Sequence, residues 1–585
     1  MAAEALSPLD ASFLQIEDHE SHMHVAALLI FEGEAPPYDE FLDYVASRLH
    51  LVPRYRQRAV TDPLNLGRPR WVDDAHFDLP YHVRATALPR PGGEYELEVL
   101  AGRVFSQRLN SDKPLWEMWL VEGFEGNRHA IVSKTHHALV DGIAGLDLLS
   151  MLFAPDAEEE EETPWRPSRS PSSLELLAEA AIERVTAPLR LVAPAVGLAL
   201  RPDRALGKVR EAATGLGAMA LAGLDPAPRL PYNRGTVGGD RRFSFVRADL
   251  DDLKAIKNEL GGTVNDVILA VVTRALRRDL ERRGEEVGAL EVKAFVPISV
   301  RPEEARGETG NQVTGMIVRL PVSCPDPAEC LQRIRHATAR EKASGQALGA
   351  RALTDLAGFA PPTLMTQGAR LAAVQRFVNL VVTNVPGPQE PLEADGRRLL
   401  DLIPMVPVGR NLGLSIGIVS YDGGMAFGVM ADFDAVPDVE NIGEDLRSAL
   451  AEMAEAAGVE LGAEAPAPEP EPEAAPRPEP IAEVVQREVE QTGPAGGPPP
   501  PEPDAELVAE AAEPGAEQGA GPQIHVSEPW PGYDGMRAPD LIAHFGEASE
   551  EALGVVRLYE ATHRGRREVM DAAERALARR QGAAR

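Results

Sequence analysis

Residues Ile131 to Gly142 read IVSKTHHALVDG and form the most informative pattern in the chain. The residues up to Lys134 are typical of a strand, and those from Ile143 to Leu149 predict the start of a helix. Two adjacent histidines, His136 and His137, therefore occupy a strand-to-helix turn. Histidine is the natural proton acceptor at neutral pH, because the pKa of a free imidazole lies at about 6.5. We expect the chemistry of the protein at this turn.

The motif ends in Asp141 and Gly142. A carboxylate four residues after His137 can turn back to hold the local geometry or bond across an interface, and a glycine lets the backbone bend. His137 is the candidate base. His136 is either a second catalytic residue or a buried core histidine, and spacing alone does not decide between these roles.

Around this motif the hydrophobic pattern is mixed, with strands and helices that do not alternate strictly. This pattern predicts an α+β (mixed α/β) fold of two similar lobes, 1–154 and 231–458, joined by a linker and crossover over 155–230. Helices are expected over Leu253–Leu260, Asn265–Arg282 and Pro327–Ala343. Strands are expected over Val25–Phe31, Glu117–Val121, His129–Lys134, Arg242–Val246, Lys293–Val300, Met316–Leu320, Leu380–Thr383, Leu412–Ser420 and Gly424–Val429.

The charge and the cysteines of the 585-residue chain exclude several classes of protein. Its 59 Lys+Arg stand against 91 Asp+Glu, a formal net charge of −32, which argues against nucleic acid as a partner. Cys324 and Cys330 cannot build a disulfide framework, and no spacing around them indicates a metal site. We see neither a signal peptide nor an apolar run long enough to span a membrane, so a cytoplasmic protein is expected.

Two further segments follow the second lobe. Residues 459–530 are acidic and rich in proline, which predicts a disordered linker. Residues 531–585 regain helical periodicity at Leu541, Phe545, Leu553 and Val556, and predict a small helical module. The module either binds an unknown partner, held near the two lobes by its tether, or is an inert appendage.

At this point the chain resembles the wax ester synthase/diacylglycerol acyltransferase family of bacteria, within the superfamily of chloramphenicol acetyltransferase and condensation domains. The resemblance covers about Leu6 to Gly458. The motifs that carry it are Leu6-Ser7-Pro8-Leu9-Asp10-Ala11, Pro114-Leu115-Trp116-Glu117, the His136 to Gly142 motif, Gly262-Thr263-Val264-Asn265-Asp266-Val267, Val296-Pro297-Ile298-Ser299-Val300-Arg301 and Thr383-Asn384-Val385-Pro386-Gly387-Pro388.

The resemblance implies two lobes like those of chloramphenicol acetyltransferase, with the active site in a tunnel between them. Acyl-CoA would enter as a substrate from one side, and diacylglycerol or a long-chain alcohol from the other, with no cofactor and no metal. His137 would be the general base, with His136 beside it as a second candidate. Asp141, Gly142, Asn265, Asp266 and Arg301 would support the site structurally.

Asn265 and Trp116 each leave an alternative open. Asn265 is expected either to donate a hydrogen bond near an oxyanion or, with Asp266, to cap the following helix and only support the interface between the lobes. Trp116 is expected to pack in the core rather than contact substrate.

The crossover between Leu174 and Leu224 is apolar with flanking basic residues. This suits either a peripheral contact with the inner membrane or a lipid droplet, or a bridging helix pair packed on the lobes. Two other functions remain open: a condensation-type acyltransferase that uses a carrier-protein thioester, and a non-catalytic lipid-binding scaffold.

Overall fold

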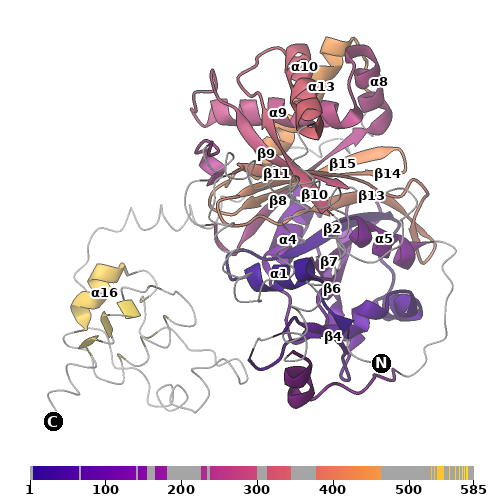
Figure 1. Ribbon diagram of the computed structural model, residues 1–585, viewed down its shortest axis with the longest axis vertical. Coiled ribbons are helices and arrows are strands. Elements are labelled where there is room, and N and C mark those ends of the chain that lie inside the picture. The colour runs from indigo at the N-terminus through magenta and orange to yellow at the C-terminus, as the bar shows by residue number, and fades with distance from the viewer. Residues whose placement is uncertain are drawn as a thin grey trace, which may run out of the picture. The chain divides into compact units, whose positions relative to one another are not determined.

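The computed structural model describes residues 4–64, 67–139, 142–154, 165–180, 225–233, 237–299, 313–343, 377–462 and part of 529–576. The chain divides into two compact units, Met1–Pro468 and Glu469–Arg585. The first unit contains two six-stranded sheets and a small three-stranded sheet (Figure 1). The expected mixed α/β class with two lobes is confirmed.

The first sheet carries the histidine motif. Its order is β12-β13-β2-β7-β6-β5, and every neighbouring pair is antiparallel except β5 and β6. His136 is the last residue of β7 and pairs with His24, the first residue of β2. The strands are β2 (His24–Glu32), β5 (Val83–Ala87), β6 (Trp116–Phe124), β7 (Arg128–His136), β12 (Glu393–Ala394) and β13 (Arg397–Met405).

Helices and a small sheet surround this first sheet. The helices α2 (Tyr38–Arg48) and α5 (Gly142–Phe153) close a core with Phe31, Trp116 and Ile131 from the strands. The remaining elements are β1 (Glu4–Ala5), α1 (Pro8–Ile16), the 3₁₀ turns η1 (Leu49–Leu51) and η2 (Pro53–Arg56), β3 (Gln57–Val60), β4 (Arg70–Asp73), α3 (Leu79–His82) and α4 (Glu94–Ser106).

The second sheet has the order β10-β9-β11-β14-β15-β8, with β11 parallel to both β9 and β14. It follows the 3₁₀ turn η3 (Pro231–Asn233). Its strands are β8 (Arg241–Asp249), β9 (Val292–Ser299), β10 (Val313–Leu320), β11 (Leu380–Pro386), β14 (Leu414–Tyr421) and β15 (Gly424–Asp432). Each strand expected from the sequence is confirmed, although β14 begins at Leu414 rather than Leu412 and Val300 lies outside the described residues.

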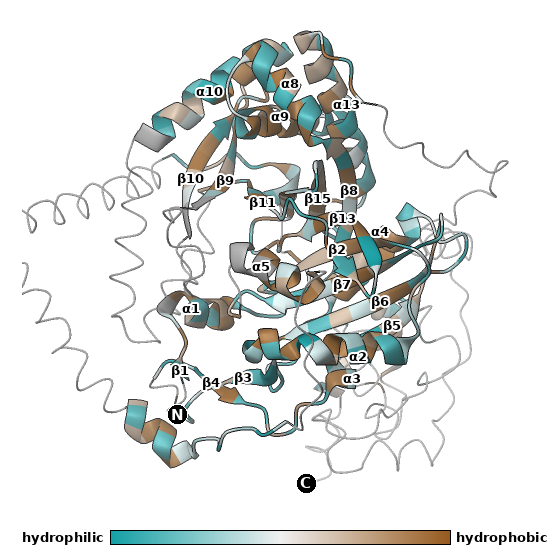
Figure 2. Ribbon diagram, turned by 90° about the vertical axis from the view of Figure 1, so that its right-hand side faces the viewer, coloured by the Kyte–Doolittle hydropathy of each residue, from teal (hydrophilic) through white to brown (hydrophobic). Residues whose placement is uncertain are grey.

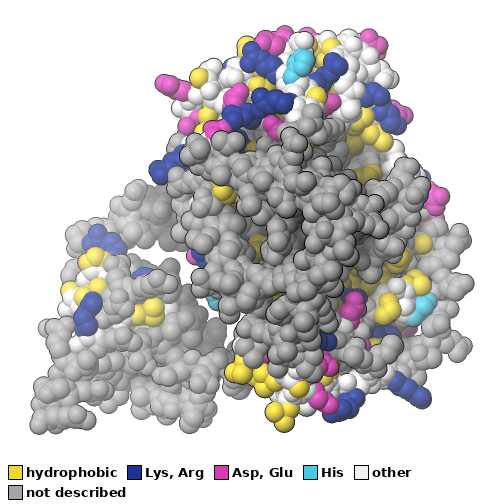
Figure 3. Space-filling model, in the orientation of Figure 1, with side chains coloured by type: hydrophobic (Ala, Val, Ile, Leu, Met, Phe, Trp, Pro, Cys, Tyr) yellow, Lys and Arg dark blue, Asp and Glu magenta, His cyan; other side chains and the backbone are white. Residues whose placement is uncertain are grey.

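One helix is the centre of the second lobe. The side chains of α9 (Val264–Arg282) from Val267 to Leu276 are almost all buried, because α9 lies among α8 (Leu250–Leu260), α10 (Pro327–Ala343) and α13 (Val439–Ala457) (Figures 1 and 2). Acidic and basic side chains are mixed over the end of the molecule where these helices lie (Figure 3), as in the Arg333–Glu329 pair at 2.5 Å. This outer surface is an ordinary solvated face.

The two sheets are linked more closely than the division into 1–154 and 231–458 anticipated. The β13 strand, from the second half of the chain, pairs with β2 and completes the first sheet. In the other direction, α4 from the first half packs on the edge strand β8, where Glu98 accepts hydrogen bonds from the Ser244 hydroxyl and the Phe245 amide at 2.8 and 2.9 Å. Each lobe therefore supplies part of the other.

The sheets approach most closely at β13. A Cβ atom added at Gly428 of β15 would lie 1.8 Å from the carbonyl oxygen of Pro404, and one added at Gly417 of β14 would lie 2.6 Å from Val406. Only glycine fits at Gly428 without moving a strand, since the contact is with backbone.

The second unit has a small core of its own. It joins α16 (Ala538–His544) to later apolar residues, including Leu541, Leu553 and Val556 from the expected pattern. Glu560 is fully buried, accepts from the Tyr533 hydroxyl at 2.7 Å and pairs with Arg566 at 2.5 Å. Most of the linker 459–530 lies outside the described residues, as does the crossover beyond residue 180.

Substitution of Gly428 tests the contact between the sheets. We expect Gly428→Ala to lower the free energy of unfolding by about 1–3 kcal/mol, because the added methyl group forces β15 and β13 apart. The control is Gly288→Ala, where nothing lies within 4 Å of the added Cβ. Urea unfolding of both variants checks this, and equal stabilities would contradict the close approach.

Candidate active site

The turn after β7, here called the histidine turn and defined as His136 to Leu139, has a hydrogen-bond acceptor for each main-chain amide. The His136 amide donates to Leu115 O at 2.9 Å, and the His137 amide donates to Met23 O at 2.8 Å. The Ala138 amide donates to the His136 ring, and the Leu139 amide donates to His136 O, both at 2.9 Å. A turn with all its amides paired has a fixed backbone.

The His136 side chain is part of the set of hydrogen bonds that holds the turn, here called its frame. It is fully buried, and its Nδ1 accepts the hydrogen bond from Ala138, so the neutral ring carries its hydrogen on Nε2. That Nε2 faces Glu17, whose Oε2 lies 3.8 Å away and also binds Arg108 at 3.1 Å. Burial lowers the pKa of His136 to about 3, so the ring stays neutral at working pH. This position favours a supporting role, although His136 stays a predicted catalytic residue.

The His137 side chain lies in a different environment. It is only half-buried, while its Nδ1 is enclosed by protein. Its ring stacks on Phe13 of α1, with 4.6 Å between ring centroids and 21° between planes. Of the two adjacent histidines, only His137 is partly exposed.

A buried lysine ties the strand of the histidines to α4. The Nζ atom of Lys134 donates to Val104 O at 2.9 Å and Gln107 O at 2.8 Å, and lies 3.5 Å from Glu117. His24 of β2 donates to Phe105 O at 2.6 Å. These donors bind carbonyls at the C-terminal end of α4, where the last turn of a helix leaves carbonyl oxygens without the usual amide partner four residues on. The end of α4 is thereby fixed beneath β7 and β2.

The entry to α9 holds the second motif. Thr263 and Asp266 form a capping box, in which the Asp266 amide donates to Thr263 Oγ1 at 3.2 Å and the Thr263 amide donates to Asp266 at 2.9 Å. Asp266 also accepts from Thr338 at 2.8 Å. Asn265 takes no part in this cap, contrary to one of the two expectations for it; instead Asn384 of β11 donates to its Oδ1 at 3.4 Å.

Other residues singled out in the sequence have varied positions. Gly142 is the first residue of α5, whereas Asp141 and Arg301 lie outside the described residues. Trp116 is buried, stacks on Tyr55 and donates to its carbonyl at 2.8 Å, which confirms its packing role.

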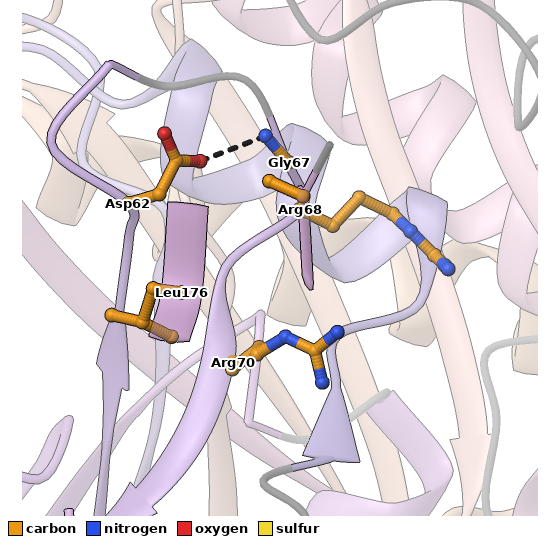
Figure 4. A pocket seen from close by; sticks show the side chains of 6 residues that line it. Asp62, Gly67, Arg68, Arg70 and Leu176 are labelled. Atoms are coloured by element: carbon orange, nitrogen blue, oxygen red, sulfur yellow. Dashed lines mark hydrogen bonds between the residues drawn. The ribbon is translucent and has the colours of Figure 1, made fainter. Parts of the chain in front are cut away.

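A small pocket lies elsewhere in the first lobe, where the helix over 173–180 meets the small sheet (Figure 4). Its polar groups are already paired: the Gly67 amide donates to Asp62 at 2.8 Å, and Arg70 binds Glu179 at 3.1 Å. None of its lining residues belongs to the histidine turn. The pocket therefore has a structural explanation and is not the candidate site.

Comparison with known proteins fits this fold and site. Residues 6–268 match the wax ester synthase/diacylglycerol acyltransferase catalytic domain, and residues 309–454 match the WS/DGAT C-terminal domain. A putative diacylglycerol O-acyltransferase of Mycobacterium bovis and a probable one of Mycobacterium tuberculosis are each 35% identical over 463 residues, covering 77% of this chain and 95% of theirs.

Among solved structures, the wax ester synthase/diacylglycerol acyltransferase of Marinobacter aquaeolei VT8 is similar, with a TM-score of 0.54 and 26% identity over 78% of this chain and 100% of that one. Fold, site and relatives together define an acyltransferase. The chain belongs to the wax ester synthase/diacylglycerol acyltransferase family.

Sequence reasoning missed the residues that hold the histidine turn from outside it. Phe13, Glu17 and Met23 contact the turn across more than a hundred positions of the chain. The sequence held a partial indication that this N-terminal segment matters, because the motif from Leu6 to Ala11 ends two residues before Phe13.

The buried histidines predict a dependence of stability on pH. Burial lowers the pKa of His22 to about 4 and of His136 to about 3, and lowers that of His24 well below its usual value. Below about pH 6.5 the unfolded chain therefore binds protons that the folded chain does not. The free energy of unfolding consequently decreases as the pH is lowered. Burial raises the pKa of Glu98 to about 7, which acts in the opposite sense and offsets roughly one histidine.

We expect the free energy of unfolding to fall by at least about 2 kcal/mol between pH 6.5 and 5.5, because burial also lowers the pKa values of His82 and His129. A His24→Gln variant should lose up to about 1 kcal/mol less over that interval, since it removes one such group while its amide can still donate to Phe105 O. Urea titrations at the two pH values measure both slopes. Identical slopes for the native protein and the variant would contradict the account.

Proposed function

We propose that the protein transfers the acyl group of a long-chain acyl-CoA to the hydroxyl of diacylglycerol, with His137 as general base. The observation that carries the assignment is the contrast within the motif, where the His136 ring is buried in the frame and the His137 ring is half-buried on a fixed turn. The names of the mycobacterial relatives support diacylglycerol as acceptor, and that of the Marinobacter protein adds a long-chain alcohol as the alternative.

In the proposed reaction, His137 removes the proton from the acceptor hydroxyl as that oxygen attacks the thioester carbonyl. The tetrahedral intermediate collapses with cleavage of the carbon–sulfur bond, and the proton passes to the leaving thiolate. The products are an ester and free CoA, so neither a covalent acyl-enzyme nor a cofactor is needed. The burial of Nδ1 supports Nε2 as the nitrogen that meets the hydroxyl.

The two substrates would meet between the lobes. Support comes from the coupling of the lobes through β13 and α4, which holds both halves of such a tunnel in one compact unit. Asn265, on the second lobe and hydrogen-bonded to Asn384, is the proposed donor toward the oxyanion. Asp141, Gly142, Asp266 and Arg301 are the proposed structural support.

Release of CoA tests the proposal. Purified protein is given palmitoyl-CoA with dioleoylglycerol or with hexadecanol, and free thiol is measured. We expect release that depends on the acceptor, and a loss of at least about 10²-fold in His137→Ala, because general-base assistance is worth about 10²–10⁴ in rate. The control His76→Ala changes an exposed histidine and should match the native rate.

Two outcomes would overturn this function. If His137→Ala keeps the native rate, His137 is not the base. If neither alcohol supports release, the acyl-CoA reaction is wrong, and a carrier-protein donor or a lipid-binding scaffold becomes the better account.

We further propose that the enzyme works at a lipid surface. No helix in the described part of the chain is long and apolar enough to cross a membrane. The support is the crossover sequence, in which the uncharged run Leu191–Leu200 is flanked by basic residues.

Flotation with vesicles of phosphatidylglycerol and dioleoylglycerol tests this surface contact. We expect the native protein to float with the vesicles, and Arg201→Glu with Arg204→Glu to weaken binding about 30-fold or more, since each basic residue near an anionic surface contributes about 1 kcal/mol. The control is the double variant Arg333→Glu with Arg340→Glu, which reverses the charge of two exposed residues on α10. Equal flotation of both double variants would contradict the proposed surface.

A further inference from the structure

Helix α1 packs directly on the histidine turn. Leu6 and Ala11 form a small apolar cluster with Ala138 of the turn and with Leu115, the residue whose carbonyl accepts from His136. Phe13 and Leu14 are packed against the same cluster. The N-terminal helix is therefore packed against the histidine turn, although it is far from the motif in sequence.

Both ends of α1 are anchored. At its start, the Leu6 amide donates to Pro69 O at 2.8 Å, and Ser7 caps the helix by accepting from the Asp10 amide at 3.1 Å. At its end, Glu17 binds Arg108 at 3.1 Å and accepts from the Met23 amide at 3.4 Å. A helix held at both ends presents its side chains from a fixed position.

Met23 joins this helix to the catalytic residue. Its amide donates to Glu17, and its carbonyl accepts from the His137 amide at 2.8 Å. The main chain of His137 is therefore tied to the segment that leaves α1. These bonds fix the backbone of His137, whereas the plane of its ring is set by rotation about two side-chain bonds and by the contacts of the ring itself.

One contact that restrains the ring is the stack on Phe13. The rings are nearly parallel at 21°, with centroids 4.6 Å apart, so Phe13 covers one face of the imidazole. Rotation of the imidazole about either side-chain bond would drive its edge into the phenyl ring or break the stack. Proton transfer requires a ring nitrogen to point at the hydroxyl, and a misplacement of about 1 Å can cost 10²-fold in rate.

We propose that Phe13 is a positioning residue, which holds the plane of the His137 imidazole for proton transfer. This inference rests on the proposed role of His137 as general base. The stack acts on kcat rather than on binding, because Phe13 contacts the base and not the substrates in this account. An aromatic ring is required, since an aliphatic side chain of similar volume offers no flat face.

Four variants of the full chain separate positioning from packing. Phe13→Leu keeps apolar volume and removes the ring, Phe13→Tyr keeps the ring, and Leu14→Ala removes apolar contact from the same cluster without touching the stack. Steady-state CoA release and thermal midpoints are measured for each. We expect Phe13→Leu to lower kcat about 10-fold or more with KM values within about 2-fold, Phe13→Tyr to retain most activity, and Leu14→Ala to lower only the midpoint.

The fourth variant combines Phe13→Leu with His137→Ala. If Phe13 acts through His137, the double variant has the same residual rate as His137→Ala alone. If Phe13 only packs α1, its effect is the same in both backgrounds, and Phe13→Tyr loses as much activity as Phe13→Leu; either result would overturn the inference. A native rate in His137→Ala would instead overturn the proposed function, so the two failures are distinguishable.

Discussion

A strand that ends inside a protein must find acceptors for its last amides, and the turn after β7 is built on this constraint. The amides from His136 to Leu139 are all paired, one of them with the His136 ring itself. An unpaired buried amide costs as much as a lost hydrogen bond, so the turn has little freedom to adopt another course. The adjacent histidines thereby acquire different roles, because one ring is used in the frame and the other is turned out of it.

The frame extends through both lobes. Lys134 and His24 hold the end of α4 beneath the histidines, and the middle of α4 holds the edge strand β8 through Glu98. β13 returns from the second half of the chain to pair with β2. The position of the histidine turn therefore depends on contacts from both halves of the unit Met1–Pro468.

Periodicity was enough to locate the six strands of the second sheet, the strands β2, β6 and β7 of the first, and helices α8, α9 and α10, because their apolar residues repeat with the spacing of the element. It did not identify β5, β12 or β13 as strands, and the pairing of β13 with the distant β2 leaves no local pattern. Thr263 and Asp266 were recognisable as a helix start from local capping chemistry. The stack of Phe13 on His137 was not recognisable, because it joins residues that only the tertiary fold brings together.

The most direct test of the central claim is a crystal structure of the protein with a non-hydrolysable thioether analogue of palmitoyl-CoA and a short-chain diacylglycerol. The account expects the free hydroxyl within about 2.6–3.2 Å of a ring nitrogen of His137, which is hydrogen-bond reach for a general base. The imidazole should remain stacked on Phe13. A hydroxyl bound to any other side chain, with His137 out of reach, would contradict the assignment of His137 as the base.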